Sequence, residues 1–544
     1  MGPALGPRGL PQTVQNRPLE LALSSVRPPA EPSPSVELDA VFTQPDGTRL
    51  RVPGFWAGGP QWRVRYASPQ IGRHQWRTEC SDAGDTGLHG AAGEIEVAPY
   101  TGDNPLYLHG PLRVSADRRH FQHADGTPFF WLGDTWWMGL CRRLRFPDEF
   151  DTLVADRRRK GFNVVQIVAG LYPDMPPFDP RGSNEAGFPW ETDWSRIRPA
   201  YFDAADRRIE ALVEAGLVPC LVGAWGYFLP WMGIERAKCH WRYLVARYGA
   251  LPVVWCVAGE ANLPFYLEPG FPFDDRAQVR GWTEVARYVR QIDPFRRPAS
   301  IHPTGLGRLS ARGAIGDAAL LDFDMLQTGH GLREVLAPTI RTLRASYASE
   351  PVMPVLNSEV AYEALLDRIP ADIQRLMFWA CVLAGAAGHT YGANGIWQVN
   401  RSGEPYGASP HGGNYGTLPW EAAMRLDGSR QLGLGKALLE RLQWHRFEPH
   451  PEWATFAAGA GEDEWDVPYA AGIPAGVRVV YVPRRSPVTV HGLDGGPRYR
   501  AAWFDPEGGA TSGLAAVEPD ADGSWTCPPP DGARSDWVLI LDNR

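Results

Sequence analysis

Two apolar segments of the chain each end abruptly in a glutamate. Residues 253–258 run into Gly259 and Glu260, and residues 352–358 run into Glu359. An apolar run without alternation is typical of a parallel strand that is buried on both faces. In an α/β barrel, the carboxyl ends of such strands carry the catalytic residues. Two carboxylates that meet there can serve as the acid and the nucleophile of a glycoside hydrolase.

The neighbours of the two glutamates suggest which role each plays. A catalytic acid needs a pKa that is raised by burial or by a nearby negative charge. We interpret Glu260, with the amide of Asn262 close by, as the acid/base. We interpret Glu359 as the nucleophile, because the hydroxyl of Tyr362 could hydrogen-bond a charged carboxylate. The reverse assignment stays open, and Glu363 is a competitor that we expect to orient a neighbour or bind a sugar hydroxyl.

Aromatic and polar side chains gather at the other predicted strand ends. Sugars present apolar C–H faces and rings of hydroxyls, so a sugar pocket requires aromatic platforms beside polar groups. The alternatives are helix capping for Asp134, a structural role for His302 and core packing for any single tryptophan. The residues that we expect to contact substrate are Asp134, Trp136, Trp137, Gln166, Trp225, Asn262, His302, Gln327, His330, Tyr362, Glu363, Tyr391 and Trp397.

The middle of the chain, residues 112–450, repeats a strand–loop–helix pattern. Amphipathic helices are predicted over residues 196–215, 276–292 and 370–384. This pattern favours a (β/α)8 TIM barrel, in which Glu260 and Glu359 end strands four and seven. The rival is an open doubly wound sheet, but the chain has neither GxGxxG nor Walker A. The eight predicted strands are 129–136, 162–169, 217–225, 253–259, 298–302, 322–327, 352–358 and 388–391.

Both flanks of this region read as antiparallel β-structure. Residues 36–105 show short alternating runs separated by Asp-Gly and Gly-Gly turns, and residues 451–544 return to short strands with Gly/Pro turns. Such patterns are typical of β-sandwiches. Residues 1–35 form a Pro-rich leader with one strand expected at 19–23. The predicted fold class is therefore α/β, a TIM barrel flanked by an N-terminal and a C-terminal β-sandwich.

Composition excludes several other classes of function. A net charge of −8 argues against nucleic acid or an anionic membrane as partner. The seven cysteines include no CxxC pair, so we expect reduced thiols rather than disulfides. No HExxH, EF-hand or GxSxG motif is present, and we predict no metal and no cofactor. Without a signal-peptide pattern or an 18-residue apolar run, we expect a cytoplasmic protein, unless the start codon is mis-set. The oligomeric state stays open.

Residues 126–450 resemble the apiosidase-like glycoside hydrolases. The matching segments are 130–136 (FWLGDTW), 161–166 (GFNVVQ), 255–262 and 357–363, while 54–66 and 481–506 resemble the sandwiches that commonly flank this barrel. The resemblance implies a retaining mechanism with the acid/base at Glu260 and the nucleophile at Glu359. One departure is Gly259, where many related barrels carry an Asn that contacts the sugar 2-hydroxyl. Asn262 or another residue must then take that role, and apiose specificity is not implied.

The leading hypothesis is a retaining, exo-acting glycosidase that cleaves a polysaccharide-derived oligosaccharide. The alternative is a non-catalytic carbohydrate-binding protein on a degenerate barrel, although a decaying site tends to lose its carboxylates. An inverting hydrolase or a transglycosylase would use the same residues and differ in water placement or acceptor.

Overall fold

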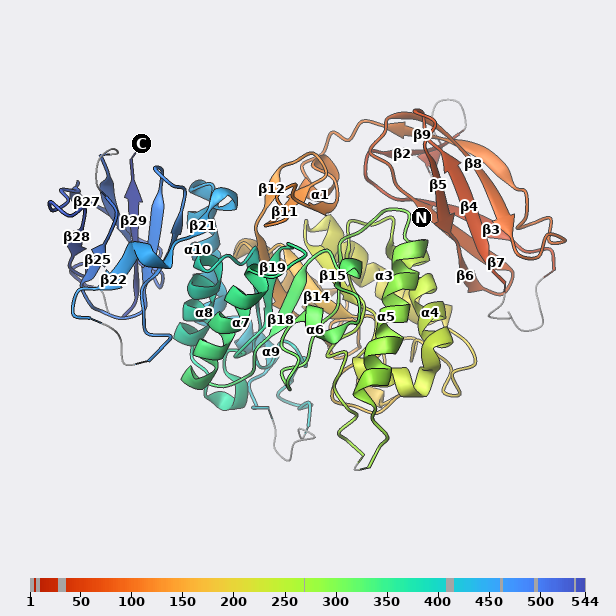
Figure 1. The fold of residues 1–544 in the computed structure, drawn as a ribbon. Helices are drawn as coiled ribbons and strands as arrows, with labels where there is room; N and C mark the ends of the chain where they lie inside the picture. Colours follow the sequence, from red (N-terminus) through yellow and green to blue (C-terminus); the bar gives the residue numbers. More distant parts are fainter. Residues whose placement is uncertain are drawn as a thin grey trace.

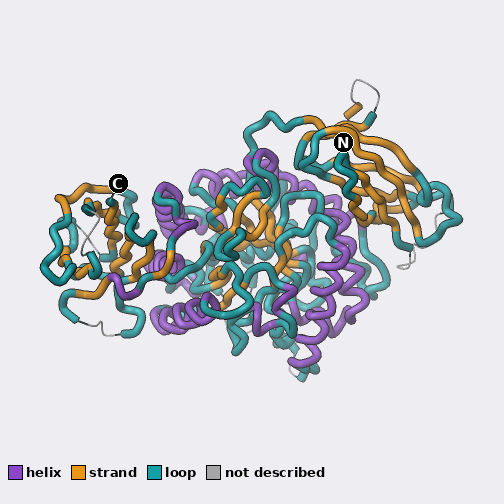
Figure 2. Tube along the Cα trace, turned by 45° about the horizontal axis from the view of Figure 1, so that its top comes forward, coloured by secondary structure: helices purple, strands orange, loops and turns teal. Residues whose placement is uncertain are grey.

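The computed structural model describes residues 4–5, 10–27, 36–268, 270–407, 415–459, 463–493, 498–532 and 535–543. A helix-covered barrel lies in the middle of the molecule, and a β-rich domain lies at each end (Figures 1 and 2). The predicted fold class, a TIM barrel between two β-sandwiches, is confirmed. None of the helices in these ranges is long and apolar enough to cross a membrane.

The barrel consists of eight parallel strands that are arranged around it in sequence order. Between the two ends of the sheet, the backbone N–H of Asp322 donates to the carbonyl of Ala299 over 2.8 Å. The Ser300 hydroxyl also donates to the Phe323 carbonyl over 2.7 Å, so the barrel is nearly closed. The strands are β13 (Trp131–Thr135), β14 (Val164–Val168), β15 (Val218–Val222), β16 (Val254–Cys256), β17 (Ala299–Ser300), β18 (Asp324–Gln327), β19 (Val355–Glu359) and β20 (Gly388–Tyr391).

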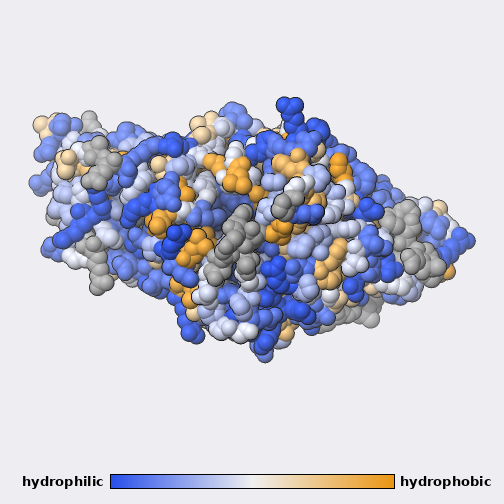
Figure 3. All heavy atoms as spheres, turned by 90° about the horizontal axis from the view of Figure 1, so that it is seen from below, coloured by the Kyte–Doolittle hydropathy of each residue, from blue (hydrophilic) through white to orange (hydrophobic). Residues whose placement is uncertain are grey.

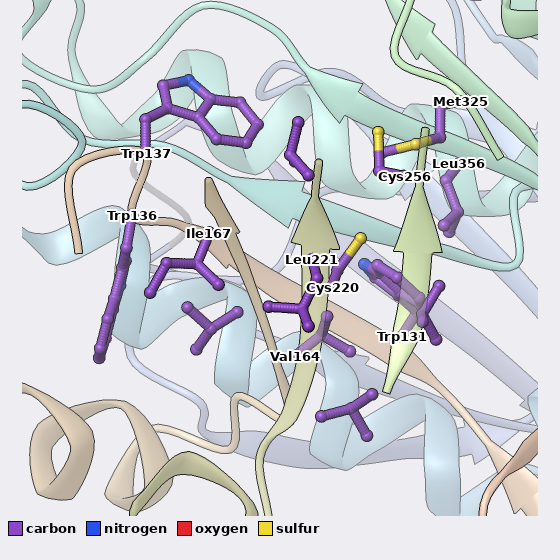
Figure 4. Close-up of a cluster of buried hydrophobic side chains, with 14 of the residues drawn as sticks. Trp131, Trp136, Trp137, Val164, Ile167, Cys220, Leu221, Cys256, Met325 and Leu356 are labelled. Atoms are coloured by element: carbon purple, nitrogen blue, oxygen red, sulfur yellow. The ribbon is translucent and has the colours of Figure 1, made fainter. Parts of the chain in front are cut away.

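These strands lack alternation because both of their faces are buried. Every residue of β14 and β15 is buried. Side chains from five strands lie together in one cluster, namely Trp131, Cys220, Cys256, Met325 and Leu356 (Figure 4). The expectation of reduced cysteines agrees with the structure, since all seven are free and only Cys239 is partly exposed.

Helices cover the outside of the barrel (Figure 1). The three helices predicted from sequence correspond to α3, α5 and α8 with ends shifted by three residues or fewer. The helices are α1 (Pro105–Leu108), α2 (Asp148–Arg159), α3 (Pro199–Glu214), α4 (Leu229–Tyr248), α5 (Asp275–Ile292), α6 (Ala311–Ala314), α7 (Leu336–Tyr347), α8 (Ala371–Leu383), α9 (Trp420–Ala423) and α10 (Asp427–Arg441).

The N-terminal sandwich packs a six-stranded sheet on a three-stranded sheet. The strand expected at 19–23 is β3, and residues 11–14 add β2, so the predicted boundary at residue 36 lies inside the sandwich. Leu19 and Leu21 are buried in the sandwich core, which explains why this segment belongs to the domain. Leader residues 1–3, 6–9 and 28–35 lie outside the described residues. In spatial order, the six-stranded sheet contains β1 (Ala4–Leu5), β2 (Pro11–Val14), β9 (Ala92–Ala98), β8 (Gly72–Cys80), β4 (Leu38–Thr43) and β5 (Arg49–Pro53). The three-stranded sheet contains β3 (Leu19–Ser24), β7 (Gln61–Tyr66) and β6 (Phe55–Gly58).

A small sheet joins this sandwich to the barrel and lies at the barrel's amino-terminal end (Figure 1). It contains β10 (Leu112–Val114), β11 (Phe121–His123) and β12 (Pro128–Phe129). The Phe121 ring lies 5.3 Å from the rings of both Trp131 and Phe323. This end of the barrel is therefore closed by aromatic packing, and only the opposite end is left for chemistry.

The C-terminal sandwich also has a six-stranded and a three-stranded sheet. Its strand β24 is buried on both faces. One face packs on the three-stranded sheet of this sandwich, and the other packs on α8. The rings of Trp379 and Tyr481 are nearly parallel across this junction, with centroids 6.0 Å apart. In spatial order, the six-stranded sheet contains β21 (Glu448–Pro449), β23 (Tyr469–Gly472), β24 (Arg478–Val482), β29 (Trp537–Asp542), β26 (Arg500–Phe504) and β27 (Thr511–Ala516). The three-stranded sheet contains β22 (Ala454–Phe456), β25 (Val488–Val490) and β28 (Trp525–Cys527).

Candidate active site

The loops that follow the barrel strands form the mouth opposite the small sheet. Figure 3 looks onto this face and shows apolar side chains gathered around a recess near its centre. Glu260 lies just beyond β16 and Glu359 is the last residue of β19, so both reach the mouth. Glu260 has a φ of 37°, a left-handed conformation that side chains rarely adopt. Such strain persists where the surrounding structure imposes it, and functional sites are common places for it.

A short backbone ladder holds Glu260 in this position. The bridge between Trp225 and Gly259 extends the pairing of β15 with β16 beyond both strands. Gly226 N–H donates to the Gly259 carbonyl over 2.6 Å, and Gly259 N–H donates to the Ala224 carbonyl over 2.9 Å. A Cβ atom on Gly259 would lie 2.3 Å from the Trp225 ring, so only glycine fits there.

The side chain of Gln327, at the end of β18, joins the two glutamates. Its Nε2 donates to Oε1 of Glu260 over 2.8 Å and to Oε1 of Glu359 over 3.3 Å. These two oxygens therefore lie no more than about 6.1 Å apart, the sum of the two distances. The structure thus brings the two predicted carboxylates together at one place.

The surroundings of Glu260 favour its protonated form. Burial, followed by the negative charge of Glu359, raises the pKa of the Glu260 carboxyl well above its usual value. The hydrogen bond from Gln327 and the bond from Trp225 Nε1 to Oε2, 3.2 Å long, oppose this shift without cancelling it. A carboxyl with a raised pKa can donate a proton near neutral pH.

The surroundings of Glu359 favour its ionised form. Burial alone would raise its pKa, but the hydrogen bond from His330 and the charges of His330 and His302 hold the pKa below its usual value. His330 Nε2 donates to Oε1 over 2.8 Å, and His302 Nε2 lies 3.4 Å from Oε2. The rings of Tyr362 and His330 lie side by side with centroids 4.7 Å apart. The Tyr362 hydroxyl also lowers the pKa of the Glu359 carboxyl. An ionised, buried carboxylate is suited to nucleophilic attack.

Aromatic rings line the mouth around the pair. Trp137 contacts Trp225 and His302 edge to face, with centroid distances of 5.3 and 5.7 Å. In Figure 4 the Trp137 ring lies beyond the arrowheads of the strands, whereas Trp136 points away from it. Trp397, in the loop after β20, packs against Tyr406 with centroids 5.6 Å apart.

Four of the residues expected in the pocket point toward the helices instead. Both carboxylate oxygens of Asp134 are engaged, by Thr135 N–H at 2.9 Å, by Trp136 Nε1 at 2.6 Å and by Arg157 Nε of α2 at 2.5 Å. Asp134 therefore holds β13 to α2, and neither the sugar-binding nor the helix-capping interpretation describes these contacts. Trp136 packs on Phe150 of α2.

The other two residues of this outer group are Glu363 and Tyr391. The Tyr391 hydroxyl donates to Oε2 of Glu363 over 2.5 Å, and Gly428 N–H at the start of α10 donates to the same oxygen over 3.1 Å. Glu363 thus stabilises the first turn of α10 rather than a sugar. For Asp134 of β13 and Tyr391 of β20, the physical reason is the strand's period of two, which turns alternate side chains away from the barrel interior.

Two predicted amide side chains lie in the interior of the barrel domain. Gln166 is fully buried and donates to the carbonyl of Ser358, next to Glu359, over 3.2 Å. Asn262 is also buried, and among the residues that the structure describes neither its Nδ2 nor its Oδ1 has a hydrogen-bond partner. Gln166 therefore stabilises β19, the strand that ends in Glu359. Asn262 contributes buried polar atoms that could bind a ligand.

Sequence reasoning missed a group of loop residues beside Glu260. Tyr266, after β16, donates to Oδ1 of Asp174, which lies in the loop after β14. After burial and Glu359, the charge of Asp174 is a further cause of the raised pKa of Glu260. Tyr227, in the 3-10 helix Gly226–Phe228, donates to the Tyr172 carbonyl over 3.1 Å and so anchors this loop. These residues lie far from strand ends, and only the density of tyrosines in the loops signals them.

Across the parts of the chain that the structure describes, no three His, Cys, Asp or Glu side chains form a group that could hold a metal ion. The two carboxylates can themselves supply acid–base and nucleophilic chemistry. The surroundings raise the pKa of one and lower the pKa of the other, inside a ring of aromatic and polar groups.

Solved structures share the architecture. A glycoside hydrolase from Bacteroides vulgatus is 18% identical, with a TM-score of 0.67 over 98% of this chain and 100% of that chain. A family 5 glycoside hydrolase from the same species is 24% identical, with a TM-score of 0.64 over 80% of this chain and 93% of that chain. At these identities the similarity establishes the fold. No curated protein matches the chain.

Family models extend the comparison to the sequence. Residues 471–542 match a model named for collagen binding by a collagenase, and residues 13–81 match a domain of unknown function. Residues 115–446, more than half of the chain and the whole barrel, match the model described as the apiosidase-like catalytic domain. The resemblance noted in the sequence is thereby confirmed, and the chain belongs to the apiosidase-like family of glycoside hydrolases.

Proposed function

We propose that this glycoside hydrolase is a retaining, exo-acting O-glycosidase of polysaccharide-derived oligosaccharides. Glu359 is the nucleophile and Glu260 the acid/base. The observation that carries the proposal is the pair of carboxylates joined by one amide, one with a raised and the other with a lowered pKa. Opposite shifts in neighbouring carboxyl groups are the usual sign of an acid and a base.

The reaction follows in two steps. Glu359 attacks the anomeric carbon while Glu260 gives its proton to the leaving oxygen, so the glycosidic bond breaks and a glycosyl-enzyme ester forms. Glu260, now ionised, takes a proton from water as the water oxygen attacks the same carbon, and the ester bond to Glu359 breaks. The sugar is released with its original configuration, and both carboxyl groups return to their starting protonation states.

The spacing of the carboxylates supports retention rather than inversion. Retaining enzymes keep the two groups about 5–5.5 Å apart, whereas inverting enzymes need about 6.5–9.5 Å to admit a water. The limit of about 6.1 Å, which the two Gln327 hydrogen bonds set for one oxygen of each carboxylate, admits the shorter spacing of a retaining pair.

The enclosure of the site supports exo action. Glu359 is 5% exposed, and Trp137, Trp225 and Trp397 around the mouth are buried. An enclosed mouth would admit the end of an oligosaccharide, whereas cleavage within a polymer requires a groove that is open at both sides. The aromatic faces suit the C–H surfaces of a terminal sugar.

Chemical rescue of two variants tests the roles. With dinitrophenyl glycosides, Glu359→Ala should lose about 10⁴-fold or more in kcat, and azide should restore turnover as a glycosyl azide of inverted configuration. Glu260→Ala should lose about 10²–10⁴-fold with a poor leaving group, and azide should give the retained azide. NMR of the products distinguishes the two anomers.

Glu268→Ala, which changes an exposed glutamate in the loop after β16, is the matched control and should keep wild-type activity. Exchanged azide configurations would reverse the two roles. Sugar binding by the wild type without turnover of any glycoside would instead support the non-catalytic carbohydrate-binding alternative.

A further inference from the structure

Gln327 has one polar atom that its contacts with the carboxylates do not use. A primary amide has two N–H donors, and those of Nε2 serve Glu260 and Glu359. Its carbonyl oxygen Oε1 is buried and has no hydrogen-bond partner among the described residues. Buried side-chain polar atoms are nearly always paired, so this oxygen requires an explanation. Its place beside both carboxylates points to a partner that arrives with the substrate.

The kind of partner follows from the position of the amide and from the chemistry of sugars. The anomeric carbon must lie between the two carboxylates during the reaction. Two ring atoms flank that carbon, the ring oxygen and the neighbouring carbon. The ring oxygen has no hydrogen to donate, and a carbonyl oxygen can only accept. The hydroxyl on the neighbouring carbon, position 2 of an aldose, is therefore the donor that fits Oε1.

No side chain at position 259 can take this role. A Cβ atom there would lie 2.3 Å from the Trp225 ring, which fills the space and donates to Glu260 over 3.2 Å. Asn262 is another amide nearby, and both of its polar atoms are buried without a hydrogen-bond partner in the described part of the chain. Among the described residues, however, only Gln327 donates hydrogen bonds to both carboxylates.

We propose that Gln327 determines specificity by accepting a hydrogen bond from the hydroxyl next to the anomeric carbon, so that the enzyme selects glycosides in which this hydroxyl is free. The inference rests on the proposed retaining function and names its substrate class. A 2-deoxy sugar leaves Oε1 unpaired at the reacting centre, and sites built to bond a hydroxyl discriminate strongly against analogues that lack it.

Paired substrates separate this role from a merely structural one. The wild type and Gln327→Met are compared on the dinitrophenyl glycoside that the wild type cleaves best and on its 2-deoxy counterpart. The ratio of the two kcat/KM values is taken within each enzyme, and comparing these ratios cancels the intrinsic reactivity of the 2-deoxy sugar. We expect the wild-type preference for the hydroxylated sugar to exceed that of Gln327→Met by about 10- to 100-fold.

Asn262→Ala is the matched control and should keep the wild-type ratio. An unchanged ratio in Gln327→Met, or a collapsed ratio in Asn262→Ala, would overturn the inference. Calorimetry with an iminosugar that carries or lacks the corresponding hydroxyl repeats the comparison without turnover. If the wild type cleaves glycosides but Gln327→Met keeps its ratio, only the inference fails. If the wild type neither cleaves any glycoside nor binds either iminosugar, the proposed function fails and the inference with it.

Discussion

At the residue scale, the opposite pKa shifts of Glu260 and Glu359 predict the pH dependence of the reaction. kcat/KM should fall at low pH as Glu359 gains a proton and at high pH as Glu260 loses one. Burial and the charge of Glu359 raise the Glu260 pKa, and the Trp225 N–H opposes the rise by favouring the ionised form. Trp225→Phe removes that donor and keeps most of the ring. We expect the alkaline limb to move up by about one pH unit, with the acid limb unchanged.

Trp397→Phe is the control for this shift. Within the described ranges its Nε1 has no hydrogen-bond partner, so the same substitution should leave both limbs in place. The measurement is the pH dependence of kcat/KM with one substrate for the wild type, Trp225→Phe and Trp397→Phe. An alkaline limb that moved down in Trp225→Phe would contradict the assignment of Glu260 as the group that must be protonated.

Asp134 carries a second prediction at this scale. Its carboxylate pairs with Arg157, and both side chains are fully buried. Breaking a buried ion pair costs about 3–5 kcal/mol, and Arg157 keeps its contact with Asp156 over 2.6 Å, so we expect the lower end, about 3 kcal/mol. Asp134→Ala should therefore lower the midpoint of urea unfolding markedly, while the KM of the folded enzyme stays near the wild-type value. A large rise in KM with unchanged stability would restore the sugar-binding interpretation.

The example of Asp134 shows what the sequence could and could not predict about the site. The sequence locates the barrel strands, because long apolar runs end in polar residues near the mouth, although the exact strand ends differ. A strand buried on both faces shows no alternation, so its sequence does not tell which side chains point inward. Glu359 and Gln327 reach the mouth, whereas Asp134 and Tyr391 face the helices.

At the element scale, the junction of β15 and β16 controls the position of Glu260. Gly259→Ala adds a methyl group that would lie 2.3 Å from the Trp225 ring, so the ring or the ladder must move. A misplacement of about 1 Å near the reacting centre costs about 10²-fold in rate, and we expect a loss of that size in kcat/KM. In Gly313→Ala, on α6, the added methyl group meets no atom within 4 Å, and activity should stay at the wild-type level. Equal activity of the two variants would show that the ladder does not position Glu260.

The order and type of the elements could be predicted better than their extent. All eight barrel strands lie where the apolar runs are, but β16 has three residues and β17 two, because loops and isolated bridges replace the ladder beyond them. The sandwich strands β2 and β3 were hidden within a Pro-rich segment. β2 pairs with β9, about 80 residues away, and local patterns do not report such contacts.

At the scale of the whole molecule, buried ion pairs join both sandwiches to the barrel. Arg65 of β7 donates to Asp206 of α3 over 2.5 Å, and Arg247 of α4 donates to the same carboxylate over 2.8 Å. At the other end, Arg375 of α8 donates to both oxygens of Asp536 over 2.6 and 2.7 Å. The partners lie far apart in the sequence, so no local pattern could predict them. Because these side chains are buried, each junction depends on its full set of partners.

The C-terminal junction supplies the last prediction. Asp536→Ala leaves Arg375 buried beside Gln431 and without its carboxylate, which should cost about 3–5 kcal/mol of unfolding free energy. Glu464→Ala removes the partner of Arg341 at the same junction, where both side chains are 57% exposed, and should cost about 1 kcal/mol or less. Urea unfolding followed by tryptophan fluorescence compares the two, since Trp379 and Trp537 lie on either side of the junction. Equal losses in the two variants would mean that the sandwich is held by its apolar face on α8 and not by the buried pair.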